Sequence, residues 1–140
     1  MPVVYFDSSA LVKLVVDEDG SELAAALWDG CDAAVSSRLA YPEVRAALAA
    51  AARDHRIDAR ALRAAQADWE NFWAATQPVE LTTTVERHAG LVATTYALGG
   101  ADAVHLASAL AILPTDMIVA VWDRRLGDGV RAAGLPVAPA

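Results

Sequence analysis

The sequence has one cysteine, Cys31, and one lysine, Lys13. A single cysteine cannot form a disulfide within the chain, and it excludes a zinc site built from several cysteine thiolates. No apolar run reaches the ~20 residues that a membrane-spanning helix needs. The first apolar run stops at Asp7 and no basic residue precedes it, so we do not expect it to be a signal peptide. From these absences we expect a cytoplasmic protein.

What the chain does have is an apolar and acidic composition. Its 140 residues are 56% apolar, above the roughly 45–50% of average domains, so we expect one folded domain over residues 1–140. The net charge of −7 argues against non-specific nucleic-acid binding, which normally needs a basic surface. Six arginines are nevertheless gathered in one stretch: Arg38, Arg45, Arg53, Arg56, Arg60 and Arg63. They form either a solvated helical face or a binding stripe, and the sequence leaves both open.

Short β-rich runs alternate with long runs of alanine and leucine. Buried strands are expected at 3–6 and 117–122, which are apolar without polar alternation. Further extended segments are expected at 32–37, at 79–84 as a short strand or link, and at 135–139 as an edge strand. Helices are expected at 7–18, 21–30 (capped by Ser21), 39–54, 58–76, 85–98, from 101 to before Pro114, and at 124–133. Alternating strands and helices predict an α/β three-layer sandwich, with a parallel sheet of four or five strands between helices.

Four acidic residues occur at comparable places in this pattern. Asp7 and Asp123 follow the two best strands, while Glu43 and Asp102 lie in the first turns of helices. Taken singly, each has a structural explanation: Asp7 and Asp102 could be helix caps or first-turn acids, Asp123 a turn residue and Glu43 a surface acid. Taken together, they could converge, because ligands of open parallel sheets bind at the carboxyl ends of the strands.

Converging carboxylates repel one another and would protonate unless a cation neutralised them. The single lysine lies at position 13, so no ammonium later in the chain can serve. Oxygen ligands favour a hard divalent ion, Mg²⁺ or Mn²⁺, held by Asp7, Glu43, Asp102 and Asp123. Such ions activate water and stabilise charge on phosphate oxygens, so the reaction class that fits is phosphodiester hydrolysis.

Four stretches together resemble the successive motifs of PIN-domain ribonucleases, and most closely the VapC-type toxins of toxin–antitoxin pairs. The stretches are FDSSALVKLVVDEDGSE at 6–22, AYPEVRAAL at 40–48, LGGADAVHLASAL at 98–110 and VAVWDRRL at 119–126. The resemblance covers nearly the whole chain. It implies RNA cleavage dependent on Mg²⁺ or Mn²⁺ at the four acids, a homodimer, and inhibition by a small VapB-type antitoxin that reaches into the active-site groove.

Two further positions bear on this resemblance. Ser9 matches a small hydroxyl residue that follows the first acid in the family, where it could bond a ligand carboxylate or simply occupy the first helical turn. The family often has a hydroxyl residue two positions before its last acid, whereas this sequence has Val121. The departure weakens the assignment of Asp123.

Other interpretations remain. His105 lies three residues after Asp102 and could be a ligand, but a buried, hydrogen-bonded structural histidine is favoured. A receiver-type phosphoryl-accepting domain would need paired acids after the first strand and a late lysine, and the chain has neither. A catalytically inactive PIN-fold module that binds RNA or a partner protein is the remaining alternative.

Overall fold

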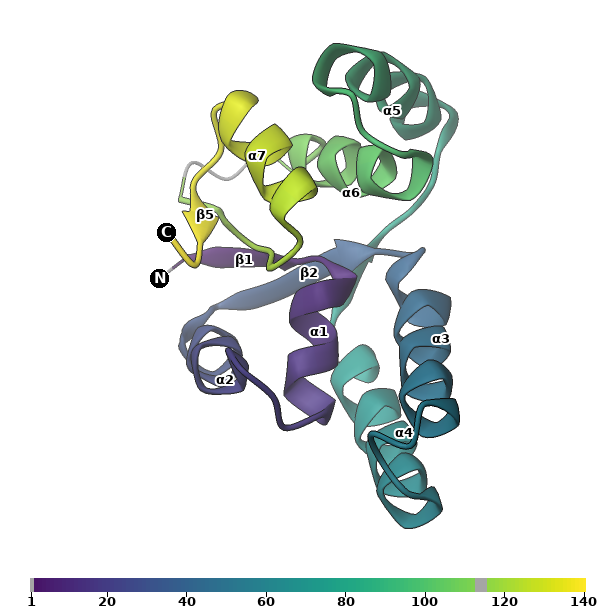
Figure 1. Ribbon diagram of the computed structural model, residues 1–140. Helices are drawn as coiled ribbons and strands as arrows, with labels where there is room; N and C mark the ends of the chain where they lie inside the picture. Colours follow the sequence, from purple (N-terminus) through teal and green to yellow (C-terminus); the bar gives the residue numbers. More distant parts are fainter. Residues whose placement is uncertain (1, 113–115) are drawn as a thin grey trace.

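The computed structural model describes residues 2–112 and 116–140, in which five strands alternate with seven helices (Figure 1). The strands are β1 (Val3–Phe6), β2 (Ala33–Ser37), β3 (Gln77–Val79), β4 (Ile118–Ala120) and β5 (Val137–Ala138). The helices are α1 (Ser8–Val15), α2 (Ser21–Gly30), α3 (Ala40–Arg53), α4 (Ala59–Ala74), α5 (Thr83–Tyr96), α6 (Gly100–Leu110) and α7 (Arg124–Ala132). No helix among the described residues is long and apolar enough to cross a membrane.

The five strands form one parallel sheet in the order β3-β2-β1-β4-β5. β1 is the central strand, and Val4 is in register with Ala34 on β2 and Ile118 on β4. A strand at that place is covered on both faces, which explains why its sequence is a continuous apolar run. The predicted α/β class with a parallel sheet of four or five strands is confirmed.

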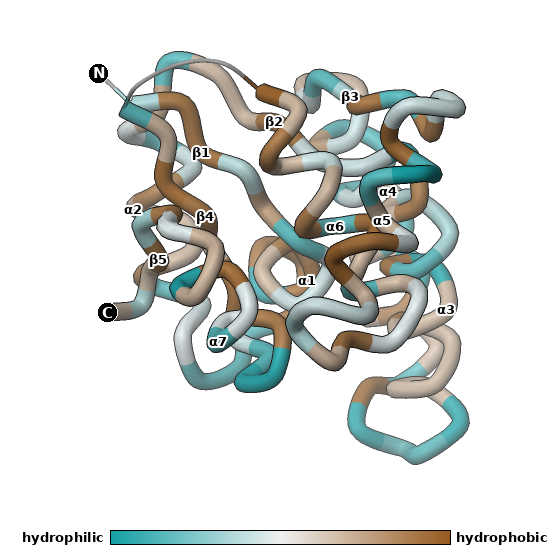
Figure 2. The backbone as a smooth tube through the Cα atoms, turned by 90° about the horizontal axis from the view of Figure 1, so that it is seen from above, coloured by the Kyte–Doolittle hydropathy of each residue, from teal (hydrophilic) through white to brown (hydrophobic). Residues whose placement is uncertain are grey.

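Helices cover both faces of the sheet and give the three layers of Figure 1, with α1–α4 on one side and α5–α7 on the other. Successive side chains of β1 point to opposite faces. Val4 and Phe6 therefore pack with Trp69 under α1, α3 and α4, whereas Tyr5 packs with Leu106 under α6 and α7. Figure 2 shows that β1 and β4 consist largely of hydrophobic residues, whereas the connection between α3 and α4 is mostly hydrophilic.

Several predicted boundaries are wrong. The third strand pairs at Gln77–Val79 rather than at 79–84, β4 ends at Ala120 rather than at 122, and α1 ends at Val15 rather than at 18. Helix α6 ends at Leu110, and Pro114, the expected terminator, lies outside the described residues.

Ser21 is the first residue of α2 and does not cap it. Its Oγ donates to the carbonyl oxygen of Val16 at 2.9 Å and accepts from the N–H of Glu18 at 3.0 Å, so it closes the turn between the helices. The N-cap is Gly20, in the left-handed conformation with φ of 91°. A Cβ at Gly20 would lie 2.6 Å from Nε1 of Trp122, so this turn needs glycine both for its backbone and for the indole packed on it.

Candidate active site at the carboxyl edge of the sheet

The four predicted acids all sit at the beginning of a helix. Asp7 and Asp123 are the N-caps of α1 and α7, where their carboxylates accept hydrogen bonds from the N–H groups of Ala10 and Leu126. Glu43 and Asp102 lie in the first turns of α3 and α6. The cap explanation is therefore confirmed for Asp7 and the first-turn explanation for Asp102, whereas Asp123, expected as a turn residue, is also a helix cap. Capping also fixes where these carboxylates point, because one oxygen of each is bonded to the backbone.

Asp7 is the most deeply buried of the four acids, with 3% of its surface exposed. Burial raises its pKa from 3.8 to about 6, although the hydrogen bond from Ser9 and the charge of His105 both act to lower it. No lysine or arginine among the described residues forms an ion pair with it. The ionised form of Asp7 is therefore destabilised by burial, and a cation bound next to it would stabilise that form.

Ser9 joins Asp7 to the end of β4. Its Oγ donates to Oδ1 of Asp7 at 2.7 Å and accepts from the N–H of Trp122 at 2.9 Å. The two bonds fix the first turn of α1 against the segment that leads to Asp123. Ser9 thus lies where a group that orients the Asp7 carboxylate is expected to lie, and it also has a structural role.

Asp102 is influenced electrostatically by Asp123 and Glu43. The pKa of Asp102 is raised, first by partial burial, then by the charge of Asp123, and to a smaller extent by that of Glu43. His105 and Arg125 act in the opposite direction. Asp123 and Glu43 therefore each lie within electrostatic range of Asp102, and His105 acts on both Asp102 and Asp7.

His105 is buried, with 2% of its surface exposed, and both ring nitrogens are bonded. Nε2 lies 2.6 Å from Oε1 of Glu43, and Nδ1 lies 2.8 Å from the hydroxyl oxygen of Tyr5. The structural interpretation of this histidine is thus the one that the geometry favours. Sequence reasoning missed Tyr5, although a phenol inside an apolar strand needs a buried hydrogen-bond partner.

Val121 supplies no polar group to this edge. Its side chain is 4% exposed and packs in the core with Leu126 and Val130. The side chain at this position therefore has no hydroxyl, but the hydroxyl of Ser9 reaches the same segment, where it accepts from the N–H of Trp122.

Carboxylate oxygens are suitable ligands for a hard divalent ion, but the described side chains do not lie close enough together to coordinate one. No group of three or more His, Cys, Asp or Glu side chains in residues 2–112 and 116–140 has the proximity that a metal needs. Glu43 is turned toward His105, and no hydrogen bond between described residues joins Asp7 to the other three acids. The chemistry of the donors does fit, because four segments supply carboxylate oxygens and the pKa values of Asp7 and Asp102 are raised first by burial, which destabilises their ionised forms.

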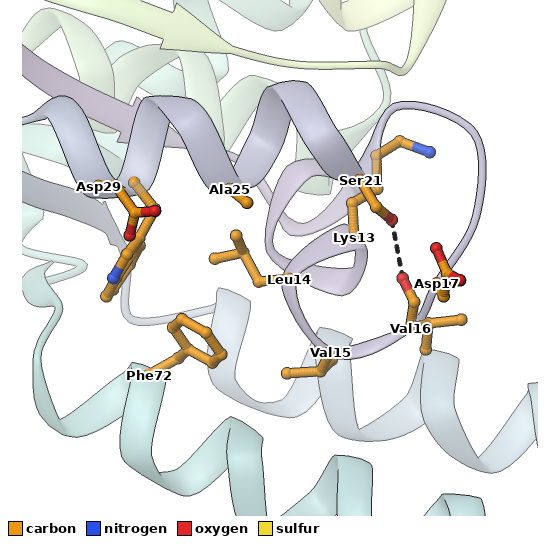
Figure 3. Close-up of a pocket in the computed structure, with 10 residues that line it drawn as sticks. Lys13, Leu14, Val15, Val16, Asp17, Ser21, Ala25, Asp29 and Phe72 are labelled. Carbon is orange, nitrogen blue, oxygen red and sulfur yellow. Dashed lines mark hydrogen bonds between the residues drawn. The ribbon is translucent and has the colours of Figure 1, made fainter.

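One hollow lies away from the acids. It has a volume of about 320 Å³ and is formed between α1, α2 and α4, with Leu14, Ala25 and Phe72 on its walls and Asp17 and Asp29 at its margins (Figure 3). Asp7, Glu43, Asp102 and Asp123 do not line it. Asp123 instead borders a smaller hollow of about 210 Å³, together with Val121 and Arg124.

The arginines that the sequence groups together are divided in the structure. Arg38 forms a bidentate ion pair with Glu80, with N···O distances of 2.7 and 3.0 Å, and Arg45 forms an ion pair with Glu70 at 3.2 Å. The other four lie at the far end of α3, in the connection and at the start of α4: Arg53, Arg56, Arg60 and Arg63. Ten residues of helix separate Glu43 from the first of these, roughly 15 Å. They do not line the acidic edge, and they form an exposed basic tip.

Residues 4–113 match the family model of the PIN domain. Ribonucleases VapC45 and VapC49 of Mycobacterium tuberculosis, strains CDC 1551 / Oshkosh and ATCC 25618 / H37Rv, are each 69% identical to the chain over 140 residues. The alignments cover 100% of this chain and 97% of each relative. The chain therefore belongs to the PIN-domain family, in its VapC group.

Two solved structures show the same fold at low sequence identity. VapBC2 from Rickettsia felis, crystallised with a DNA fragment from its promoter, gives a TM-score of 0.65 at 10% identity and covers 96% of both chains. FitAcB from Neisseria gonorrhoeae gives 0.66 at 16% identity, over 96% of this chain and 95% of the other. The architecture is therefore preserved where the sequence is not.

Proposed function

We propose that this chain is a metal-dependent endoribonuclease, the toxin of a toxin–antitoxin pair, that hydrolyses phosphodiester bonds of RNA. The observation that carries the activity is the full-length identity of 69% to two ribonucleases of the VapC group. The four acids at the carboxyl edge, Asp7, Glu43, Asp102 and Asp123, are proposed as the ligands of Mg²⁺ or Mn²⁺. PIN-domain ribonucleases are generally metal-dependent, and the raised pKa values of Asp7 and Asp102 support an ion at this edge.

The contribution of each side chain follows from its contacts. When bound, a divalent ion supplies a water of lowered pKa and stabilises charge on the phosphate oxygens. Asp7 offers a carboxylate fixed by Ser9 and by the N–H of Ala10, so little rotamer freedom remains to be lost. Asp123 is held through its cap bond to Leu126, and the RNA phosphate must approach along this exposed edge.

A protein partner is proposed on the same basis. The relatives VapBC2 and FitAcB support a VapB-type antitoxin as the partner, and the family resemblance supports a homodimer. Leu81 is 56% exposed and borders an apolar hollow with Leu39 and Trp73, which is the kind of surface that partners cover. We further propose that residues 1–140 form a single domain. For a toxin that cleaves RNA we also propose a cytoplasmic location.

The test is RNA cleavage by the purified protein with and without Mg²⁺. Asp7→Asn is expected to abolish cleavage while the fold is retained, because the amide can accept the same hydrogen bonds but carries no charge. Asp68→Asn is the matched control, since Asp68 is exposed on α4 and away from the acidic edge. Equal cleavage by parent and Asp7→Asn would reject the proposed site.

The alternative is an inactive PIN module that binds RNA or a partner protein. The observation that favours it is Val121, buried in the core where the family often has a hydroxyl. An inactive module would bind RNA without producing new RNA ends, both in the presence and in the absence of divalent ions.

A further inference from the structure

A hydrogen-bonded chain crosses the protein from the central strand to the acidic edge. Tyr5 lies on β1 and is fully buried, His105 lies on α6 with 2% exposed, and Glu43 lies on α3 with 28% of its side chain exposed. The hydroxyl of Tyr5 is 2.8 Å from Nδ1 of His105, and Nε2 is 2.6 Å from Oε1 of Glu43. Three elements far apart in the sequence thus meet in one line of bonds.

The direction of these hydrogen bonds follows from their partners. A carboxylate oxygen accepts, so the short contact with Glu43 requires a hydrogen on Nε2. When the imidazole is neutral, Nδ1 is then an acceptor and the Tyr5 hydroxyl donates to it. Burial, and secondarily the charge of Asp7, raise the pKa of Tyr5, so its hydroxyl retains the hydrogen that it donates. The two rings meet edge to face at 80°, which directs the hydroxyl to the edge of the imidazole.

We propose that His105 is a positioning residue that holds Glu43 in the orientation from which its free oxygen, Oε2, ligates the metal, with Tyr5 as the anchor. This inference rests on the proposed function. Oε2 has no hydrogen-bond partner among the described residues, while Oε1 is held by the histidine. An otherwise free glutamate has several rotamers, and an outer-shell bond that selects one of them typically strengthens metal binding 10–100-fold.

Two substitutions of the same histidine separate positioning from packing. The amide nitrogen of glutamine reaches about as far as Nε2 and can still donate to Glu43, whereas the amide of asparagine reaches about as far as Nδ1 and can contact Tyr5 alone. Both remove the ring, so a purely structural role affects them alike. We expect Mn²⁺ binding, followed by electron paramagnetic resonance, to weaken about 10–100-fold in His105→Asn and to stay near the parent value in His105→Gln.

Two more measurements keep the proposal testable if these variants fold poorly. Tyr5→Phe keeps the ring and its packing, and it is also expected to weaken Mn²⁺ binding. In the metal-free parent, long-range ¹H–¹⁵N correlation should show a hydrogen on Nε2 of His105. Equal affinity in the asparagine and glutamine variants, tighter binding in His105→Asn, unchanged binding in Tyr5→Phe, or an Nε2 without a hydrogen would each overturn the inference.

Glu43→Gln distinguishes failure of this inference from failure of the proposed function. If Glu43→Gln binds Mn²⁺ as the parent does, Glu43 is not a ligand and the proposed ligand set fails. If Glu43→Gln binds weakly while His105→Asn binds normally, the ligand set holds and the positioning role alone is rejected.

Discussion

The burial of Asp7 predicts an unusual dependence of stability on pH in the metal-free protein. Its pKa is raised from 3.8 to about 6, mainly by burial, so the folded state retains a proton that the unfolded chain loses. Between pH 3.8 and about 6 the folded state therefore binds more protons than the unfolded state. The free energy of unfolding must fall as the pH rises through this window, and the loss is complete above it.

The size of the effect follows from the same two values. The difference between 3.8 and about 6 corresponds to about 3 kcal/mol, at ~1.36 kcal/mol for each tenfold change in the ionisation equilibrium. Asp7→Asn removes the ionisation but keeps an oxygen that accepts from Ser9 and Ala10. The difference in unfolding free energy between this variant and the parent isolates Asp7, since Asp102 and the other acids are common to both.

The assay is urea denaturation of both proteins with a chelator present, at pH values across and above the window. We expect the free energy of unfolding of the variant, relative to that of the parent, to rise by about 3 kcal/mol between pH ~4 and ~7. An excess of Mg²⁺ or Mn²⁺ at neutral pH should then stabilise the parent more than the variant, by about 2.7 kcal/mol at a hundredfold excess over Kd. If the free energies of unfolding of parent and variant changed in parallel with pH, burial would not raise the pKa of Asp7 as argued.

Two other predictions concern the rest of the fold. Gly20→Ala should destabilise the protein by about 1–3 kcal/mol, because φ is positive there and the added Cβ would lie 2.6 Å from the indole nitrogen of Trp122. Gly30→Ala should be close to neutral, because its added Cβ has nothing within 4 Å. Thermal or urea melts compare the two variants, and equal losses of stability would contradict this prediction. Replacing Arg53 and Arg56 by serine should leave the free energy of unfolding within about 0.5 kcal/mol but weaken RNA or antitoxin binding in a salt-dependent way, and unchanged binding would remove that role from the basic tip.

The features that the sequence could predict are those with a local cause. The run at 3–6 identified a buried parallel strand, and Asp7 after it marked the edge where helices begin. Gly99-Gly100 likewise placed Asp102 in the first turn of a helix. These patterns depend on the periodicity of the chain and on helix ends, which neighbouring residues determine.

The features that could not be predicted depend on pairing between distant segments. The contact of His105 with Glu43 spans 62 positions, and that with Tyr5 spans 100, so no local pattern contains either. The pairing of β3 before position 80 was missed because Gln77 and Pro78 have low strand propensity, while Val35 to Ser37 on β2 supply the neighbouring strand.

The most direct test of the acidic edge as an RNA-cleaving centre is to sequence RNA ends after incubation with the purified protein and Mg²⁺. We expect new RNA ends with the parent and with Asp68→Asn, and none with Asp7→Asn or in the presence of a chelator. New ends produced equally by folded Asp7→Asn, or by the parent without divalent ions, would contradict it.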